Sequence, residues 1–115
     1  MKKVFIICSV RNATIWQMRR MEQAVQDLES QGCEVHWPPR DTDQNARGIE
    51  ICRQNMEAIK QADVVWLFYE AGSQGTHFDM GVAFALGKPL VIGHLSEFGI
   101  GKSYQRMATE WANNE

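Results

Sequence analysis

The stretch Val64–Pro89, VVWLFYEAGSQGTHFDMGVAFALGKP, predicts a strand, a loop and a helix in direct succession. The apolar run Val64–Phe68 is typical of a strand that is buried on both faces of a parallel sheet. Glu70–Gly75 contains two glycines and indicates a loop, whereas Thr76–Leu86 has the spacing of a helix. Residues 87–89 (GKP) end that helix. The segment is therefore one β-α unit of a parallel α/β sheet.

The same alternation extends over the rest of the chain. Apolar runs predict further strands at Val4–Cys8, at Cys33–Trp37 and from Leu90 onward. Helices are expected from Thr14 to Gly32, along Ile49–Ile59 and along Tyr104–Trp111, with polar loops at Arg40–Arg47 and Ser96–Gly101. Strands that alternate with helices imply a parallel sheet with right-handed crossovers. We therefore expect residues 1–115 to form a single α/β domain with a three-layer, flavodoxin- or Rossmann-like fold and a parallel sheet of four to five strands.

Charge and length exclude several classes of partner. The chain has 115 residues, 44% of them hydrophobic, which suffices for one domain with its own core. The net charge of −2 gives no electrostatic reason to expect a nucleic-acid polymer, and Arg19-Arg20 is only a pair on a helix. Because no apolar stretch approaches the length of a membrane span, we expect no membrane partner either.

Cysteine and histidine usage indicates neither disulfides nor metals. Cys8, Cys33 and Cys52 lie far apart in apolar settings, and their odd number argues for a reduced, cytoplasmic protein. The three histidines do not combine with cysteines or carboxylates at zinc-ligand spacing. Motifs for dinucleotides and ATP are missing, so we expect no metal and no cofactor. Cys8 ends a buried strand without an evident base, which argues against a nucleophilic role.

Three loops are the places to look for a ligand, because ligands bind outside the carboxyl ends of the strands in such sheets. They are Ser9–Ala13, Pro38–Arg47 and Glu70–Thr76. Trp37, at the start of the middle loop, is available for stacking on a base. The first and third loops follow strands that the parallel topology places at one edge.

The segment Gly72–Gly81 has the features of an anion site. The N–H groups at a helix start and the helix dipole attract an anion, and Ser73 adds a hydroxyl donor. Gly75 lets a ligand approach the backbone closely, and Asp79 lies near the same opening. The spacing of Thr76 and Asp79 is also close to a capping box, and the two interpretations can hold together.

The loop Ser9-Val10-Arg11-Asn12 offers a hydroxyl, backbone N–H groups and a guanidinium, which suit a phosphate. Taken alone, it is better explained as an ordinary β-α turn in which Ser9 and Asn12 act as caps, but the parallel topology places it at the same sheet edge as Ser73–Thr76. On the second helix, Asn55 is by default a solvated position.

Together these pieces resemble the nucleoside 2-deoxyribosyltransferase superfamily, and most closely its branch of 2′-deoxynucleoside 5′-monophosphate N-glycosidases. The resemblance rests on residues 8–12 (CSVRN), 62–65 (ADVV) and 72–89 (GSQGTHFDMGVAFALGKP). It implies that Asp79 attacks the anomeric carbon of a deoxyribose, as in a retaining glycosidase, with Asn55 as a sugar or base contact. It also implies a grip on the 5′-phosphate by the residues Ser9, Val10, Arg11, Asn12, Ser73, Gly75 and Thr76.

Two positions depart from the family pattern. The family nucleophile is usually Glu, and Asp79 is one methylene shorter. The family also usually places an Asp at the position of Asn55, and an amide cannot act as a general acid or base. The sequence thus leaves two functions open: an N-glycosidic-bond enzyme, or a nucleotide-binding sensor on the same fold. A third alternative is a loop that only caps a helix.

Relatives in this family are usually dimers or larger, which implies a homodimer or higher homo-oligomer here. Four apolar residues, Trp16, Met18, Met21 and Trp111, exceed the obvious needs of one small core. Either they form a face that packs against a partner, or they fill the core.

Overall fold

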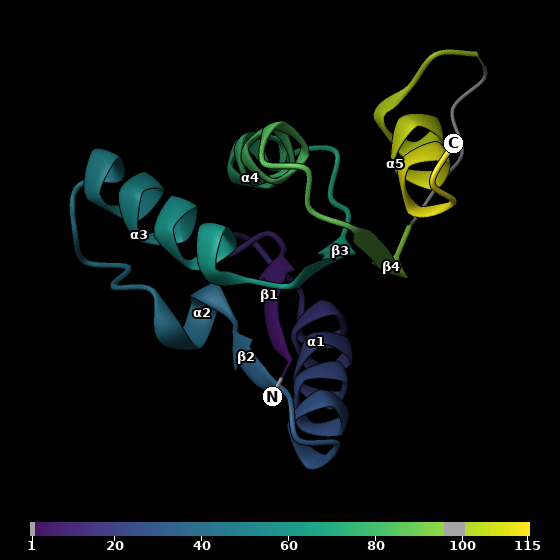
Figure 1. Cartoon of the computed structure of the whole chain (residues 1–115). Coiled ribbons are helices and arrows are strands. Elements are labelled where there is room, and N and C mark those ends of the chain that lie inside the picture. Colours follow the sequence, from purple (N-terminus) through teal and green to yellow (C-terminus); the bar gives the residue numbers. More distant parts are fainter. Residues whose placement is uncertain (1, 96–100) are drawn as a thin grey trace.

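The computed structural model describes residues 2–95 and 101–115, and it confirms the predicted alternation of strands and helices (Figure 1). Its elements in chain order are β1 (Lys3–Ile7), α1 (Ile15–Ser30), β2 (Glu34–His36), α2 (Pro38–Asp41), α3 (Gly48–Gln61), β3 (Val64–Phe68), α4 (Gln74–Ala85), β4 (Leu90–His94) and α5 (Tyr104–Ala112). The loop predicted at Ser96–Gly101 lies largely outside the described residues.

The sheet of the described residues has four parallel strands in the order β2-β1-β3-β4, as the predicted fold class requires. The chain moves outward from β1 to β2, and then returns to the other side of β1 to place β3 and β4. The order of the strands therefore reverses between β1 and β3. In doubly wound sheets the ligand crevice lies at this switch point, outside the carboxyl ends of the two strands.

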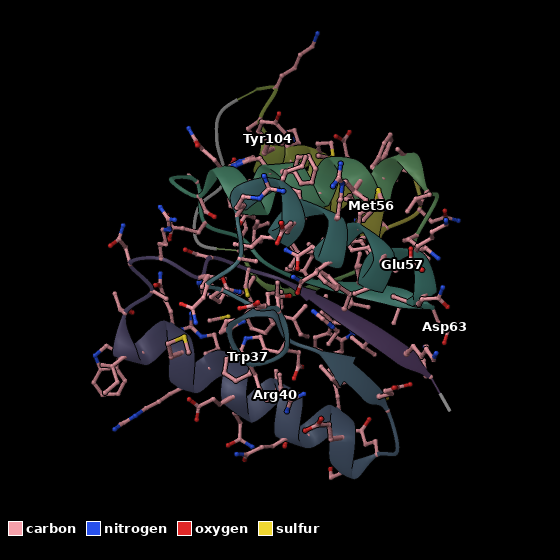
Figure 2. The ribbon with its side chains drawn as sticks, turned by 90° about the vertical axis from the view of Figure 1, so that its left-hand side faces the viewer. Trp37, Arg40, Met56, Glu57, Asp63 and Tyr104 are labelled. Atoms are coloured by element: carbon pink, nitrogen blue, oxygen red, sulfur yellow. The ribbon has the colours of Figure 1, made fainter. Side chains whose placement is uncertain are left out.

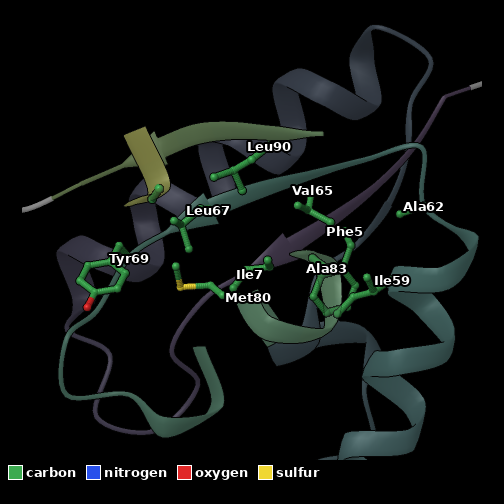
Figure 3. Close-up of a cluster of buried hydrophobic side chains, with 11 residues drawn as sticks. Phe5, Ile7, Ile59, Ala62, Val65, Leu67, Tyr69, Met80, Ala83 and Leu90 are labelled. Atoms are coloured by element: carbon green, nitrogen blue, oxygen red, sulfur yellow. The ribbon is translucent and has the colours of Figure 1, made fainter. Parts of the chain in front are cut away.

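Helices cover both faces of the sheet, which gives the expected three layers. On one face, α3, α4 and α5 enclose a cluster that contains Phe5, Ile7, Ile59, Met80 and Ala108 (Figure 3). On the other face, α1 packs Met21, Val25 and Leu28 against alternate residues of the same strands. The continuous apolar runs of β1 and β3 follow from this burial on two sides.

The short helix α2 corrects the prediction of an unstructured loop after Trp37. Pro38 and Pro39 lie in its first turn, where a fixed φ favours the helix and a missing N–H costs nothing. The carboxylate of Asp41 accepts a hydrogen bond from the backbone N–H of Trp37 at 2.9 Å. Arg40 joins the turn to α1 through Glu29 at 3.1 Å (Figure 2). This turn aims the next residue, Thr42, into the protein, where it is 5% exposed.

Candidate functional site

The loop after β1 is held in a tight turn by a hydrogen bond between its own residues. The hydroxyl of Ser9 donates to the carbonyl oxygen of Arg11 at 2.8 Å. Asn12 has φ of +61°, a left-handed conformation that Asn adopts more readily than most residues. The tight turn leaves Val10, Arg11 and Asn12 exposed at the carboxyl edge of the sheet. The guanidinium of Arg11 is therefore accessible to a ligand there.

A side-chain bridge joins this loop to the loop after β3. Thr14 and Gln17 form a capping box at the start of α1. The amide of Gln17 also donates to the carboxylate of Glu70 at 3.2 Å, and Glu70 accepts from the backbone N–H of Gly72. The two loops border one cavity, whose lining includes Ser9, Gln17, Glu70 and His94. The prediction that these loops meet at one edge is thus confirmed.

Helix α4 begins earlier than the sequence predicts, and its cap is Ser73. The hydroxyl oxygen of Ser73 accepts from the backbone N–H of Thr76 at 3.1 Å and from the Thr76 hydroxyl at 2.9 Å. The predicted capping box of Thr76 and Asp79 is therefore wrong. Thr76 is fully buried and holds Ser73 in place, whereas Asp79 lies in the second turn of the helix.

The start of α4 keeps its capacity to bind an anion. A hydroxyl that accepts two hydrogen bonds still has its own proton to donate, so Ser73 remains a donor. Gly75 is exposed in the first turn, and among the described residues nothing lies within 4 Å of where its Cβ would stand. Packing within the chain therefore leaves open space beside the first turn of α4, next to the N–H groups that attract anions.

Asp79 is buried, with 4% of the residue exposed. Burial raises the pKa of its carboxyl to about 7, and a hydrogen bond from the Asn55 amide at 3.3 Å opposes that rise. Burial, and next the charge of Asp79, raises the pKa of the Cys8 thiol to about 12. Because the thiol stays protonated at neutral pH, Cys8 is a poor nucleophile, as expected.

The default expectation of a solvated Asn55 is wrong, because Asn55 is 7% exposed and faces Asp79. Its carbonyl oxygen accepts from the hydroxyl of Thr42 at 2.7 Å. Thr42 in turn lies 2.8 Å from Nε2 of His36. Sequence reasoning missed both of these residues, since His36 ends a strand of three residues and Thr42 follows a short turn, and neither element is long enough for periodicity to mark an inward position.

The structure also contradicts the expected stacking role of Trp37. The ring is 7% exposed and belongs to the core beneath α1 (Figure 2). Its buried Nε1 has no hydrogen-bond partner among the described residues. Trp37 therefore contributes to packing near the site rather than to its surface.

Over residues 2–95 and 101–115, no group of three or more His, Cys, Asp or Glu side chains is arranged to hold a metal ion. Within the same part of the chain, none of the helices has the length and apolarity that crossing a membrane requires.

Several solved structures share this architecture. A CMP N-glycosidase from Clostridium botulinum is 25% identical, with a TM-score of 0.63 over 79% of this chain and 70% of that one. A 2-deoxyribosyltransferase from Bacillus psychrosaccharolyticus is 20% identical, with a TM-score of 0.69 over 95% of this chain and 81% of that one. A 2-desoxiribosyltransferase from Leishmania mexicana is 18% identical, with a TM-score of 0.62 over 80% of this chain and 63% of that one. The latter two likenesses, below 25% identity, establish the fold alone.

No curated protein matches the sequence. The sequence model of the nucleoside 2-deoxyribosyltransferase family, in contrast, matches residues 7–100. That range covers most of the chain, including both loops at the switch point and the buried pair Asn55 and Asp79. The resemblance seen in the sequence is thereby confirmed, and the chain belongs to the nucleoside 2-deoxyribosyltransferase family.

Proposed function

We propose that the protein binds deoxyribonucleoside 5′-monophosphates or nucleosides and cleaves or transfers at their N-glycosidic bond. Membership of the family and the likeness to an N-glycosidase support an enzyme that acts on this bond. The observation that carries the proposal for this chain is the burial of Asp79 at the switch point, with one carboxylate oxygen held by Asn55.

In this proposal the carboxylate of Asp79 is the nucleophile. One of its oxygens attacks the anomeric carbon of the sugar as the bond from that carbon to the base nitrogen breaks. The electron pair of the broken bond leaves with the base, which takes a proton. Water or a second base then attacks the same carbon, and the bond to Asp79 breaks to restore the carboxylate. Asn55 holds Oδ2 by a hydrogen bond, which leaves Oδ1 for the attack.

The phosphate of a 5′-monophosphate would lie between the two loops. Arg11 offers a charged fork, and the exposed backbone of Val10 and Asn12 lies beside it. At the start of α4, Ser73 offers its hydroxyl proton and Gly75 an accessible backbone N–H. Ser9 and Thr76 support the site, since Ser9 is hydrogen-bonded within its own loop and Thr76, in the first turn of α4, is hydrogen-bonded to Ser73.

The direct test of enzymatic activity is to incubate the protein with the four deoxynucleoside monophosphates and to measure the release of free base by chromatography. We expect release by the wild-type protein and a loss of roughly a thousandfold or more in Asp79→Ala, because the covalent step then has no nucleophile. Tight binding in a calorimeter without any release would favour the alternative, a nucleotide-binding sensor. If neither the monophosphates nor the matching nucleosides bind, both functions are excluded.

The phosphate site predicts a preference for monophosphates over the matching nucleosides. Arg11→Ala should reduce that preference roughly tenfold or more, because a charge-assisted contact is lost. The matched control is Lys60→Ala, which removes one exposed positive charge from the end of α3, at the opposite edge of the sheet. Calorimetry with each nucleotide and its nucleoside gives the ratio of the two affinities for each variant. An unchanged ratio in Arg11→Ala would contradict the phosphate site.

We also propose a homodimer or higher homo-oligomer and a cytoplasmic location. Helices α3 and α4, which pack side by side, expose Ile49, Met56 and Phe78. The apolar residues that the sequence singled out serve mainly the core instead. Met21 is buried, and Trp111 donates to the carbonyl oxygen of Lys88. Only Trp16 among them is largely exposed, at 70%.

The absence of disulfides among the three described cysteines fits a reducing compartment.

A further inference from the structure

A line of four polar side chains runs through the interior and ends at Asp79. It starts at His36 on β2, passes through Thr42 after α2 and Asn55 on α3, and reaches α4. The successive distances are 2.8 Å, 2.7 Å and 3.3 Å. Thr42, Asn55 and Asp79 are each more than nine-tenths buried, so water cannot easily replace any of these contacts.

The hydroxyl of Thr42 makes the line directional, because it has one proton and two neighbours that can accept it. If Thr42 donates to Oδ1 of Asn55, its oxygen must accept a hydrogen bond from Nε2–H of His36. The Asn55 amino group then points at Asp79, which is the arrangement of an ionised carboxylate. If Thr42 instead donates to Nε2, the amide turns over and presents Oδ1 to Asp79. That second arrangement is satisfied only when Asp79 is protonated.

We propose that Thr42 and His36 are positioning residues that act on Asp79 through Asn55, and that the direction of this line of hydrogen bonds stabilises the ionised carboxylate. The structure has the first arrangement, with the hydroxyl of Thr42 donating to Asn55 and the amide of Asn55 donating to Asp79. The inference rests on the proposed function only for the role of Asp79 as nucleophile. The line itself is a property of the protein without substrate.

The surroundings of the line favour a change of tautomer at His36 rather than a change of charge. Burial lowers the pKa of His36, with Asp41 opposing this and Arg40 adding to it. Arg40 and Asp41 are ion-paired at 2.8 Å, and the ring of Phe5 on β1 stacks on the imidazole. Beside Asp79, Cys8 stays a neutral thiol at the pH where the carboxyl titrates. Because burial lowers its pKa, His36 favours the neutral imidazole, whose single ring proton can occupy either nitrogen.

The first test measures the pKa of Asp79 in the substrate-free protein by carbon-13 NMR of its carboxyl group. Thr42→Val removes the hydroxyl and keeps the shape of the side chain, so the amide of Asn55 loses the bond that orients it. We expect the pKa of Asp79 to rise by about one unit in this variant. Thr42→Ser restores the hydroxyl and should return the pKa to within a few tenths of the wild-type value.

The control for the loss of a threonine hydroxyl is Thr109→Val, because Thr109 lies on α5 and its hydroxyl donates to the carbonyl oxygen of Gln105 in its own helix. It should leave the pKa of Asp79 unchanged. An Asp79 pKa that is equal in the wild-type and Thr42→Val proteins would overturn the proposal. If Thr42 only supported the structure, Thr42→Val would lower the stability of the protein without changing the pKa of Asp79.

The second test uses the wild-type protein and so does not depend on the folding of any variant. Nitrogen-15 spectra distinguish the two neutral tautomers of an imidazole. Above the midpoint of Asp79 we expect His36 to carry its proton on Nε2. A proton on Nδ1 at that pH would overturn the proposal. Neither test needs a substrate, so a failure to release base would refute the proposed function and leave this inference to be decided by its own measurements.

Discussion

At the scale of the residue, the main feature is a carboxylate kept where water hardly reaches it. Desolvation disfavours the charge of Asp79, and the hydrogen bond from Asn55 offsets only part of that cost. With its pKa raised to about 7, the carboxyl of Asp79 is ionised in about half of the molecules near neutral pH. The same burial keeps water away from the carboxylate, and in the proposed reaction a less solvated carboxylate is more reactive toward the sugar.

The raised pKa of Asp79 predicts how stability depends on pH. Asp79 ionises near pH 4 in the unfolded chain but only near pH 7 in the folded protein. The contribution of the protonated carboxyl to the free energy of unfolding is therefore complete below about pH 4 and is lost as the pH rises through about 7. Asp79→Asn has the same shape and no charge. The free energy of unfolding of Asp79→Asn minus that of the wild type should therefore be larger at pH 8 than at pH 5, by on the order of 2 kcal/mol.

Urea unfolding of both proteins at the two pH values measures this difference. Asp43→Asn is the matched control, because Asp43 is exposed in the loop before α3. A difference between Asp79→Asn and wild type that does not change with pH would show that the carboxyl titrates normally.

The sequence predicts those residues of the candidate site whose place follows from the order of strands and helices. Ser9 closely follows β1, while Ser73 and Asp79 lie in the loop and the first two helical turns after β3, and parallel topology places these segments at one edge of the sheet. The partner of Asp79 was not predictable, since the inward direction of Asn55 depends on the rotation of α3 against α4. Thr42 reaches Asn55 only because two prolines form a helical turn just before it.

At the scale of the element, β3 and β4 are joined by a contact that requires glycine. A Cβ atom at Gly93 would stand 2.7 Å from two ring atoms of Phe68. Phe68 is buried on the α1 side of the sheet, next to an irregularity in the β3–β4 register. Its ring therefore has little room to move away.

Gly93→Ala should consequently lower the free energy of unfolding by roughly 1–3 kcal/mol, because the ring or the strand must shift. Gly48→Ala is the control, since its Cβ would meet nothing within 4 Å among the described residues and the position begins α3. Chemical denaturation of the two variants gives the comparison. Equal stability of Gly93→Ala and wild type would mean that Phe68 relaxes without cost.

Element order was predictable here, and element ends were less so. The sequence places the start of every described strand within about one residue of its position, since an apolar run after polar residues marks where a strand begins. The start of α4 was misplaced because Ser73 and Thr76 are both good capping residues. The extended backbone of Ser73, with φ of −96° and ψ of 110°, selects the first of them, and this conformation depends on the loop from Glu70.

At the scale of the whole molecule, α1 covers one face of the sheet, while α3, α4 and α5 cover the other (Figure 1). Exposed apolar residues on α3 and α4 form the surface that we expect to pair. Ile49→Lys should shift a dimer toward monomer at micromolar concentration, because a charge would be buried on association. Ile15→Lys, at the start of α1, is the control on the opposite face. Sedimentation velocity distinguishes the outcomes, and a wild-type monomer would remove the expectation of a dimer.

The strand order also has a consequence for how the chain is made. β1 is synthesised first but lies in the middle of the sheet, and the N–H of Lys3 binds the carboxylate of Asp63, sixty residues later. During translation β1 can pair early only with the three-residue β2, so its other edge stays open until β3 leaves the ribosome. An apolar strand with an unpaired edge is prone to aggregation. Chaperone dependence of this protein should therefore be concentrated in nascent chains that end before Phe68.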